Sequence, residues 1–302
     1  NSIMAATYIL YNPVSGEEDS QIAVDALKNT YKDAEFVNVL QIPDYPGFFA
    51  DLAPEADVIL CGGDGTLNQF VNAMQGVDIA NKIYYYPVGT GNDFARDLGY
   101  DKFADPTFCI NQYLTQLPSV TVNGKTRLFI NNVGFGIDGY CCEIGDKLRV
   151  ENEKSETKKP VNYTKIAING LLRYFKPRNA VVNVDGKDYS YKRVWLAPVM
   201  NGRYYGGGMM AAPHQDRHEN EVSLVVFHDV GKLHALMIFP SIFKGEHIKH
   251  TKQITVFKGH DISVKFDQPT PLQIDGETIL DVTSYTVQSA KTEETHQPIA
   301  AL

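Results

Sequence analysis

The chain has 302 residues, of which 43% are hydrophobic and 11% aromatic, a composition typical of a globular protein with about two domains. Its 28 Lys and Arg against 36 Asp and Glu give a net charge of −8, so no overall field attracts it to nucleic acid or to anionic lipid. No apolar run approaches the roughly 20 residues that span a bilayer, and no secretory leader is evident. We therefore expect a cytoplasmic protein with no transmembrane segment and no nucleic-acid partner.

The first 117 residues alternate between segments of strand type and segments of helix type. A continuous apolar run, which is typical of a buried parallel strand, occurs at 6–13, and further strand candidates lie at 34–40, 56–61 and 82–88. Apolar residues at helical spacing lie in 22–27, in 67–74 and in 106–117, the last after Asp105 as a cap. This alternation predicts an α/β domain with a parallel sheet over residues 1–117. Whether the tail at 286–302 returns to this domain is left open.

After about residue 118 the pattern changes to strands joined by tight turns. Asn123-Gly124, Asp185-Gly186 and Asp275-Gly276 each stand between residues of strand type, which is the strongest short-range signal of a β-hairpin. A helix is predicted over 162–175, and the charged stretch 149–160 before it is expected to be a solvated loop. The sequence thus predicts a second, β-rich domain over residues 118–285.

Two glycine-rich loops follow successive predicted strands of the first domain. One reads Gly-Gly-Asp-Gly-Thr at 62–66, and the other reads Gly-Thr-Gly-Asn-Asp at 89–93. Ligands of open parallel sheets bind where strands end, at their carboxyl edge. Glycines at a strand-to-helix turn let backbone N–H groups point at an anion, and the helix N-terminus adds a favourable dipole. The two loops therefore predict a phosphate-binding site.

The side chains in these loops indicate which phosphate ligand would fit. The Thr66 hydroxyl can donate to a phosphate oxygen, and Arg96 can bring a positive charge close. Asp64 would be repelled by phosphate unless a cation such as Mg²⁺ lay between them, so the pattern favours a metal–nucleotide complex. The alternative, a plain turn whose Asp caps a helix, is weakened by the presence of two such loops. Neither a GxxxxGK[ST] phosphate loop nor a GxGxxG dinucleotide motif is present.

Four motifs, taken together and in this order, resemble one known family. They are Asn12-Pro13 with Ser15-Gly16, "GGDGTLN" at 62–68, "GTGNDFAR" at 89–96 and "QIDGE" at 273–277. The whole chain resembles the diacylglycerol kinase catalytic-domain family of bacterial soluble lipid kinases. The resemblance implies an α/β + β fold, with an N-terminal parallel α/β domain that binds ATP and Mg²⁺, a C-terminal β-sandwich domain, and the active site in the cleft between them.

The resemblance also assigns roles to individual residues. It implies that Asp64 acts through Mg²⁺ and that Glu277 accepts the proton of the attacking hydroxyl, with Asp275 beside it. Which of the two carboxylates is the base stays open, and on pattern alone a plain hairpin is favoured, because 183–189 looks the same. The implied nucleotide contacts are Asn12, Pro13, Ser15, Gly16, Gly62, Gly63, Asp64, Gly65, Thr66, Leu67, Asn68, Gly89, Thr90, Gly91, Asn92, Asp93 and Arg96.

A further segment, 212–224, resembles a family stretch that carries a structural Mg²⁺ through one acidic side chain and two backbone carbonyls. The corresponding ligands here would be the Glu219 carboxylate and the carbonyl oxygens of Asp216 and Glu221. The family usually has Asp-Gly where this chain has Glu219-Asn220, and asparagine tolerates the left-handed turn that glycine would take. The alternative is an exposed acidic loop without metal. In 134–140, the glycines indicate close packing, and Asp138 is a further candidate to face the cleft.

The function that the resemblance implies is transfer of the γ-phosphoryl group of ATP to a lipid hydroxyl, with diacylglycerol as the default substrate and phosphatidic acid as the product. The lipid would be met at a membrane surface, in peripheral and transient contact with its inner face. The apolar segment 232–245 is either a core helix or a docking surface, and Lys244, Lys249 and Lys252 could form a small basic patch. Two alternatives stay open: a kinase for a soluble hydroxyl substrate such as NAD, and a non-catalytic nucleotide- or lipid-binding regulator.

Overall fold

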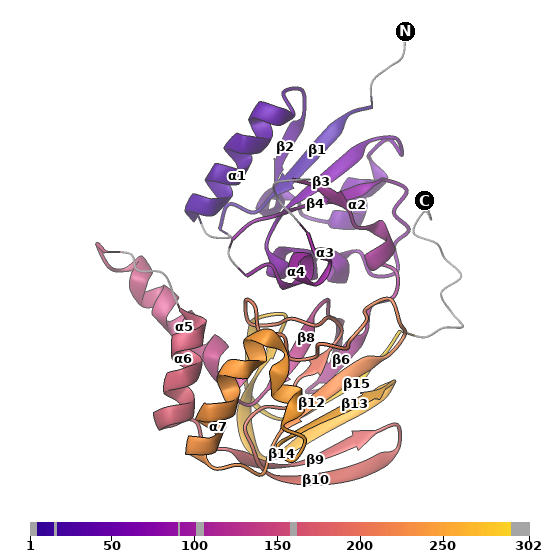
Figure 1. Ribbon diagram of the computed structural model, residues 1–302. Coiled ribbons are helices and arrows are strands. Elements are labelled where there is room, and N and C mark those ends of the chain that lie inside the picture. The colour runs from indigo at the N-terminus through magenta and orange to yellow at the C-terminus, as the bar shows by residue number, and fades with distance from the viewer. Residues whose placement is uncertain (1–4, 15–16, 90, 101–105, 158–161, 291–302) are drawn as a thin grey trace. The chain divides into compact units, whose positions relative to one another are not determined.

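The computed structural model describes residues 5–14, 17–89, 91–100, 106–157 and 162–290. The described residues divide into two compact units, one within residues 5–117 and the other comprising residues 118–290 (Figure 1). In the described ranges, no helix combines the length and the apolar character that crossing a membrane requires.

The first unit contains a five-stranded sheet in the order β2-β1-β3-β4-β5. Its first four strands are parallel to one another, which confirms the sheet predicted from the sequence, and only β5 runs antiparallel. The elements are β1 (Thr7–Tyr11), α1 (Glu17–Thr30), β2 (Glu35–Asn38), η1 (Val39–Gln41), α2 (Tyr45–Ala50), β3 (Asp57–Gly62), α3 (Asp64–Ala73), β4 (Ile83–Pro87), α4 (Asp93–Asp97), β5 (Phe108–Cys109) and η2 (Asn111–Tyr113).

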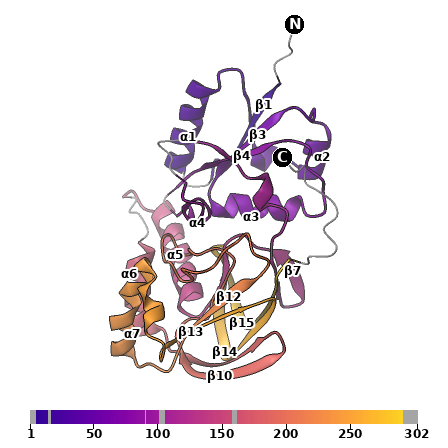
Figure 2. The ribbon, with the colours of Figure 1, turned by 45° about the vertical axis from the view of Figure 1, so that its right-hand side comes forward.

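Helices cover both faces of this sheet, with α1 on one side and α2 and α3 on the other (Figure 2). Strand β3 is buried along all but its first residue, as a strand covered on both faces must be. Successive side chains alternate between the faces. Ile9 and Ile59 pack with Leu27 of α1, whereas on the side of α2 and α3 the rings of Phe49 and Phe70 pack together.

The predicted helix over 106–117 is wrong, because this segment forms β5 and the short 3₁₀ turn η2 instead. The cause is a tertiary contact that helical periodicity cannot reveal. The buried side chain of Asn111 accepts a hydrogen bond from the Ile83 N–H at 2.7 Å and donates one to the Asn81 carbonyl at 3.0 Å. These bonds hold the segment along the edge of β4. Asp105, the predicted cap, lies outside the described residues.

The second unit is built around a ten-stranded sheet. Its main path is β13-β12-β11-β8-β14-β15-β6-β7, and β9 and β10 branch from β14. The elements are β6 (Ser119–Val122), β7 (Lys125–Leu128), β8 (Asn132–Phe135), α5 (Ile137–Glu153), α6 (Tyr163–Asn169), the π-helical η3 (Gly170–Tyr174), β9 (Arg178–Val184), β10 (Lys187–Val194), β11 (Val199–Met200), β12 (Val222–Phe227), α7 (Lys232–Ile238), η4 (Phe239–Lys244), η5 (Glu246–Lys249), β13 (Ile254–Gly259), β14 (Asp261–Ile274) and β15 (Glu277–Gln288).

The long strand β14 belongs to both branches of this sheet. Its first half pairs with β9 and its second half pairs with β8, while β15 follows it along the other edge. The register shifts between Lys265 and Leu272, where Pro269 and Pro271 cannot donate ladder hydrogen bonds. The irregularity lies between the part of β14 that pairs with β9 and the part that pairs with β8. The core between the branches includes the stacked rings of Phe135 and Phe266.

The three predicted hairpins are confirmed. Asn123, Asp185 and Asp275 have positive φ angles of 52°, 50° and 47°, and the glycine after each of them also has a positive φ. A turn of this type needs two such residues in succession, which is why asparagine or aspartate is followed by glycine.

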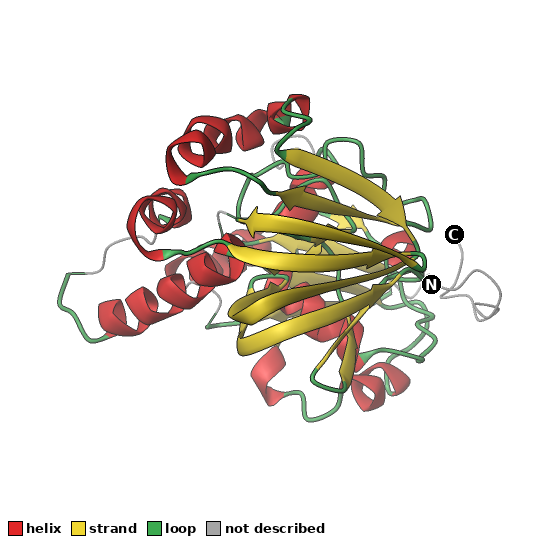
Figure 3. Ribbon diagram, turned by 90° about the horizontal axis from the view of Figure 1, so that it is seen from below, coloured by secondary structure: helices red, strands yellow, loops and turns green. Residues whose placement is uncertain are grey.

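Helices α5, α6 and α7 gather at one side of the second unit (Figures 1 and 3). The predicted loop over 149–160 is partly wrong, because α5 continues to Glu153. Ion pairs one helical turn apart, Lys147 with Glu143 and Arg149 with Asp146, support the charged part of this helix. Helix α5 also approaches β14 closely, since a Cβ added at Gly139 would lie 2.0 Å from the Pro271 carbonyl oxygen.

Candidate active site

Three loops of the first unit begin where neighbouring parallel strands end. Asn12 follows β1, Gly63 follows β3 and Gly89 lies two residues after β4, and these strands are adjacent in the sheet. The Asn12 side chain accepts a hydrogen bond from the Val14 N–H at 3.1 Å. Its carbonyl accepts one from the Ser20 hydroxyl of α1 at 2.8 Å. The predicted contacts Ser15, Gly16 and Thr90 lie outside the described residues, and Pro13 is half-buried beside Asn12.

Asp64 ties the two glycine loops together. It is the first residue of α3, and its carboxylate reaches across to the start of α4. One oxygen, Oδ2, accepts a hydrogen bond from the Asp93 N–H at 2.9 Å, and Oδ1 accepts one from the Phe94 N–H at 3.1 Å. The carboxylate therefore satisfies two backbone donors at the beginning of α4 that have no partner within that helix.

Side-chain bonds also hold the second loop from within. The Arg96 guanidinium donates to the Gly91 carbonyl at 3.0 Å and to the Asp93 carboxylate at 3.0 Å. Asn92 adopts a left-handed backbone conformation, with a φ of 47°, and its side-chain amide donates to the Gly89 carbonyl at 2.8 Å. These bonds connect Gly89 with Asn92, and Arg96 with both Gly91 and Asp93, and all five are predicted contact residues.

The glycines of the two loops serve two different purposes. A Cβ at Gly62 would lie 2.6 Å from the Thr66 side chain, so this glycine allows the strand to pack directly on α3. Thr66 is only 3% exposed, and Leu67 and Asn68 are buried with it. At Gly65 and Gly89, by contrast, an added Cβ would meet nothing within 4 Å. The backbone at these two glycines is open on one side, as contact with a ligand requires.

In the second unit, Asp275 anchors the hairpin between β14 and β15. Its Oδ2 accepts a hydrogen bond from the Ile130 N–H at 2.7 Å, and its Oδ1 accepts from the N–H groups of Asn131 and Asn132 at 2.8 and 3.0 Å. The Asp275 N–H in turn donates to the Asn132 carbonyl at 3.0 Å. One carboxylate thus accepts hydrogen bonds from three successive backbone donors at the start of β8, which fixes the position of the hairpin.

Glu277 lies two residues further along and is placed differently. Its side chain is 65% exposed and forms an ion pair of 3.0 Å with Arg127 of β7. The turn before it is held by the Gln273 side chain, whose oxygen accepts a hydrogen bond from the Gly276 N–H at 2.8 Å. Of the two acids in the "DGE" motif, Asp275 is committed to the backbone and Glu277 is available to solvent.

Asp138 lies close to this hairpin and is buried, with 4% of its surface exposed. Its Oδ1 accepts a hydrogen bond from the Tyr205 hydroxyl at 3.0 Å, and its Oδ2 has no hydrogen-bond partner among the described residues. A Cβ at Gly134 would lie within 2.4 Å of both Asp138 Oδ2 and Gln273 Nε2, so the carboxyl and the amide share the space above this glycine. Burial raises the pKa of Asp138 to about 7.

We expect Asp138 to make stability depend on pH. The unfolded chain loses this proton near its ordinary pKa of 3.8, whereas the folded protein keeps it until about pH 7. The stabilisation by the neutral carboxyl is therefore complete below about pH 4 and is lost as the pH rises towards 7, by up to about 1.4 kcal/mol per pH unit. Urea denaturation between pH 5 and pH 8 should show this slope in the wild type and a flatter dependence in Asp138→Asn. An equal slope in both proteins would contradict the assignment.

The three predicted metal ligands lie in the loop before β12. Asp216 and Glu219 are exposed, and Glu221 is half-buried next to the strand. The Asp216 carboxylate accepts a hydrogen bond from the His218 backbone N–H at 2.9 Å, and it is also hydrogen-bonded to Nδ1 of the His218 ring at 2.9 Å. These bonds lower the pKa of Asp216. Asn220 does not have the positive φ expected of it. The carbonyls of Asp216 and Glu221, which complete the predicted set, accept hydrogen bonds from the Gln215 side chain at 3.5 and 2.9 Å.

Comparison with known proteins agrees with this geometry. Residues 6–122 match the diacylglycerol kinase catalytic domain, and residues 131–290 match the YegS C-terminal NAD kinase beta sandwich-like domain. A diacylglycerol kinase of Bacillus subtilis is 26% identical over 289 residues, which cover 91% of this chain and 90% of that protein. A crystal structure of a diacylglycerol kinase from Bacillus anthracis superimposes with a TM-score of 0.58 at 16% identity, covering 96% of each chain.

The chain belongs to the diacylglycerol kinase catalytic-domain family, and most of its second unit matches the YegS C-terminal NAD kinase beta sandwich-like domain. The α/β + β fold class is thereby confirmed. Membership of this family makes the protein a kinase of the lipid kinase class, for which ATP is the phosphoryl donor.

Proposed function

We propose that the protein is an ATP- and Mg²⁺-dependent kinase that transfers the γ-phosphoryl group of ATP to the hydroxyl group of a lipid, with diacylglycerol as the substrate and phosphatidic acid as the product. The observation that carries the proposal is the pair of glycine loops joined by Asp64 at the carboxyl edge of the parallel sheet. A diacylglycerol kinase aligned over 91% of the chain supports the choice of lipid.

In the proposed reaction the loops of the first unit carry the nucleotide. The open backbone at Gly65 and Gly89 gives phosphate oxygens access to N–H groups. Asp64 would hold the Mg²⁺ of MgATP, because each of its carboxylate oxygens accepts a backbone hydrogen bond on one lone pair and can bind the ion through the other. The ion would neutralise part of the negative charge of the phosphates.

The proposed base is Glu277. Phosphoryl transfer needs positioning and charge stabilisation more than covalent help, so a single carboxylate that accepts the proton of the lipid hydroxyl is sufficient. The exposed Glu277 can approach a substrate, whereas both Asp275 oxygens are occupied by backbone N–H groups. In this assignment Asp275 holds the hairpin and Glu277 takes the proton.

The experiment that tests the proposal is transfer of labelled γ-phosphate from MgATP in mixed micelles. Diacylglycerol, phosphatidylglycerol and monoacylglycerol should be compared with NAD in the absence of lipid. We expect label in phosphatidic acid. Label only in NAD would show that the substrate is soluble, and no transfer to any acceptor would favour a nucleotide-binding regulator.

Contact with a membrane surface is part of this proposal, and α7 is its candidate site. Leu233 and Met237 stand one helical turn apart and are 77% and 79% exposed, while Ala235 and Ile238 of the same helix are buried. The helix therefore belongs to the core on one side and presents apolar side chains to solvent on the other. The exposed Lys244, Lys249 and Lys252 follow in the next turns of the chain, where they could meet anionic lipid.

Replacing both Leu233 and Met237 by Ser should lower activity on diacylglycerol in anionic vesicles by about tenfold or more, because each apolar side chain inserted into the interface contributes to binding. Activity on a short-chain diacylglycerol dissolved as monomers should be unchanged. The matched control is Leu40→Ser, which changes an exposed leucine of the first unit. Equal activity of the double variant and the wild type on vesicles would rule out α7 as the contact.

A further inference from the structure

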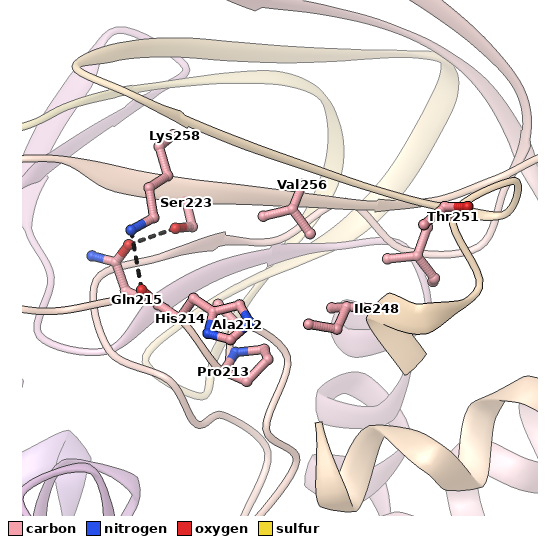
Figure 4. Close-up of a pocket in the computed structure, with 10 residues that line it drawn as sticks. Ala212, Pro213, His214, Gln215, Ser223, Ile248, Thr251, Val256 and Lys258 are labelled. Carbon is pink, nitrogen blue, oxygen red and sulfur yellow. Dashed lines mark hydrogen bonds between the residues drawn. The ribbon is translucent and has the colours of Figure 1, made fainter. Parts of the chain in front are cut away.

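The side chain of Gln215 lies at the centre of the loop that leads into β12. It is 5% exposed, and its amide nitrogen donates to the carbonyls of Glu221 at 2.9 Å and Asn201 at 3.2 Å. The Asp216 carbonyl lies at 3.5 Å from the same nitrogen. The amide oxygen accepts a hydrogen bond from the Ser223 hydroxyl at 2.5 Å (Figure 4). Both ends of the amide are therefore used, and its nitrogen is the point at which three backbone carbonyls converge.

This convergence is the arrangement that a bound cation would otherwise create. A divalent ion draws carbonyl oxygens inward to within about 2.1 to 2.6 Å, whereas here the same oxygens surround an N–H₂ group with its two protons. The Asp216 carbonyl has a further donor, the Glu219 N–H at 3.1 Å. Two of the carbonyls, those of Asp216 and Glu221, are the ones that the family resemblance assigns to a structural Mg²⁺.

Arg217, within the loop, directs its guanidinium to the Ile130 carbonyl at 3.3 Å and to the Asn131 side chain at 3.2 Å. The Glu219 carboxylate, the remaining predicted ligand, belongs to an exposed residue.

We propose that the side-chain amide of Gln215 replaces the structural divalent cation in this loop, so that the loop is closed without metal. In this arrangement the loop also supports a neighbouring segment of the chain. Arg217 binds the segment at Ile130 and Asn131, and the backbone N–H groups of the same two residues are held by Asp275. The amide of Gln215 thus supports, through Arg217, the segment on which the Asp275 hairpin rests.

Thermal unfolding of the full chain, without nucleotide or lipid, tests the proposal independently of catalysis. The wild type should have the same Tm in EDTA and in excess Mg²⁺. Gln215→Ala should lower Tm by roughly 5 °C, because the carbonyls of Asn201 and Glu221 lose the donor that Gln215 supplies. The matched control is Gln268→Ala, which removes an exposed amide of the same unit and should leave Tm unchanged.

Gln215→Glu is the sharper variant. A carboxylate in place of the amide would face the carbonyls with acceptor oxygens only, so the loop should be destabilised in EDTA and restored by Mg²⁺ or Ca²⁺. The proposal would be overturned if EDTA lowered the Tm of the wild type by several degrees and Glu219→Gln abolished that loss. It would also be overturned if Gln215→Ala and Gln215→Glu melted like the wild type in EDTA.

Discussion

Replacing Glu277 by Gln should lower kcat for lipid phosphorylation by about 100- to 10,000-fold, because the amide keeps the shape of the side chain but cannot accept a proton. Glu277 is exposed, and its ion pair with Arg127 lies at the surface, so the Tm should hardly change. The measurement is a steady-state assay with labelled MgATP, together with a melting curve. Glu246→Gln, which changes an exposed acid of the same unit, is the control and should retain full activity.

The neighbouring acid should respond in the opposite way. Asp275→Ala removes the acceptor of three backbone N–H groups, which should destabilise the second unit by about 3 kcal/mol. Activity would then fall together with Tm, instead of falling alone. If Asp275→Ala melted like the wild type while Glu277→Gln kept its activity, the two roles would have to be exchanged.

Replacing Asp64 by Asn should have the second large effect, on nucleotide binding. An Asn side chain has one oxygen, so its N–H₂ group would face the N–H of either Asp93 or Phe94. The loop that begins α4 would lose its anchor, and Asp64 would no longer attract Mg²⁺. We expect kcat/KM for MgATP to fall by about 100-fold or more, with a loss of roughly 2 kcal/mol in the free energy of unfolding.

The two contributions of Asp64 can be separated by varying free Mg²⁺ at saturating ATP. A role in holding the ion predicts that Asp64→Asn requires a higher Mg²⁺ concentration for half-maximal activity, which anchoring of the loop alone does not. Asp78→Asn, at an exposed position in the same unit, should leave both the Mg²⁺ requirement and the Tm unchanged. An unaltered Mg²⁺ requirement in Asp64→Asn would leave the residue as a structural anchor only.

The parts of the fold that sequence predicted well are those determined by local chemistry. The residues at 56–61 are apolar enough to specify a buried strand by themselves. The Asp-Gly pair at 275–276 specifies a tight turn, because both residues tolerate a positive φ. The segment 106–117 could not be predicted in this way, because the Asn111 side chain bonds to backbone nearly 30 residues earlier in the chain. Periodicity contains no information about such a partner.

The same limit applies to the candidate site. The sequence could indicate that Asp64 and Glu277 are candidate site residues. It could not indicate that Asp64 accepts hydrogen bonds from α4 or that Glu277 forms an ion pair with Arg127. The special environment of Asp138 comes from burial beside Tyr205, which no local motif encodes. The one available signal for Gln215 was a polar residue within a stretch that otherwise resembled a metal loop.

The bonds of Asp275 have a consequence for how the second unit folds. The carboxylate and its three backbone partners are separated by 143 to 145 residues along the chain. Contacts of such long range form late, because closing a large loop costs conformational entropy before the contacts can stabilise the closed chain. Strand β8 and the hairpin that carries Glu277 can therefore reach their final positions only together, after most of the unit has been assembled. A chain interrupted before β14 would have neither the hairpin nor a fixed β8, so competence for catalysis should appear in the last step of folding.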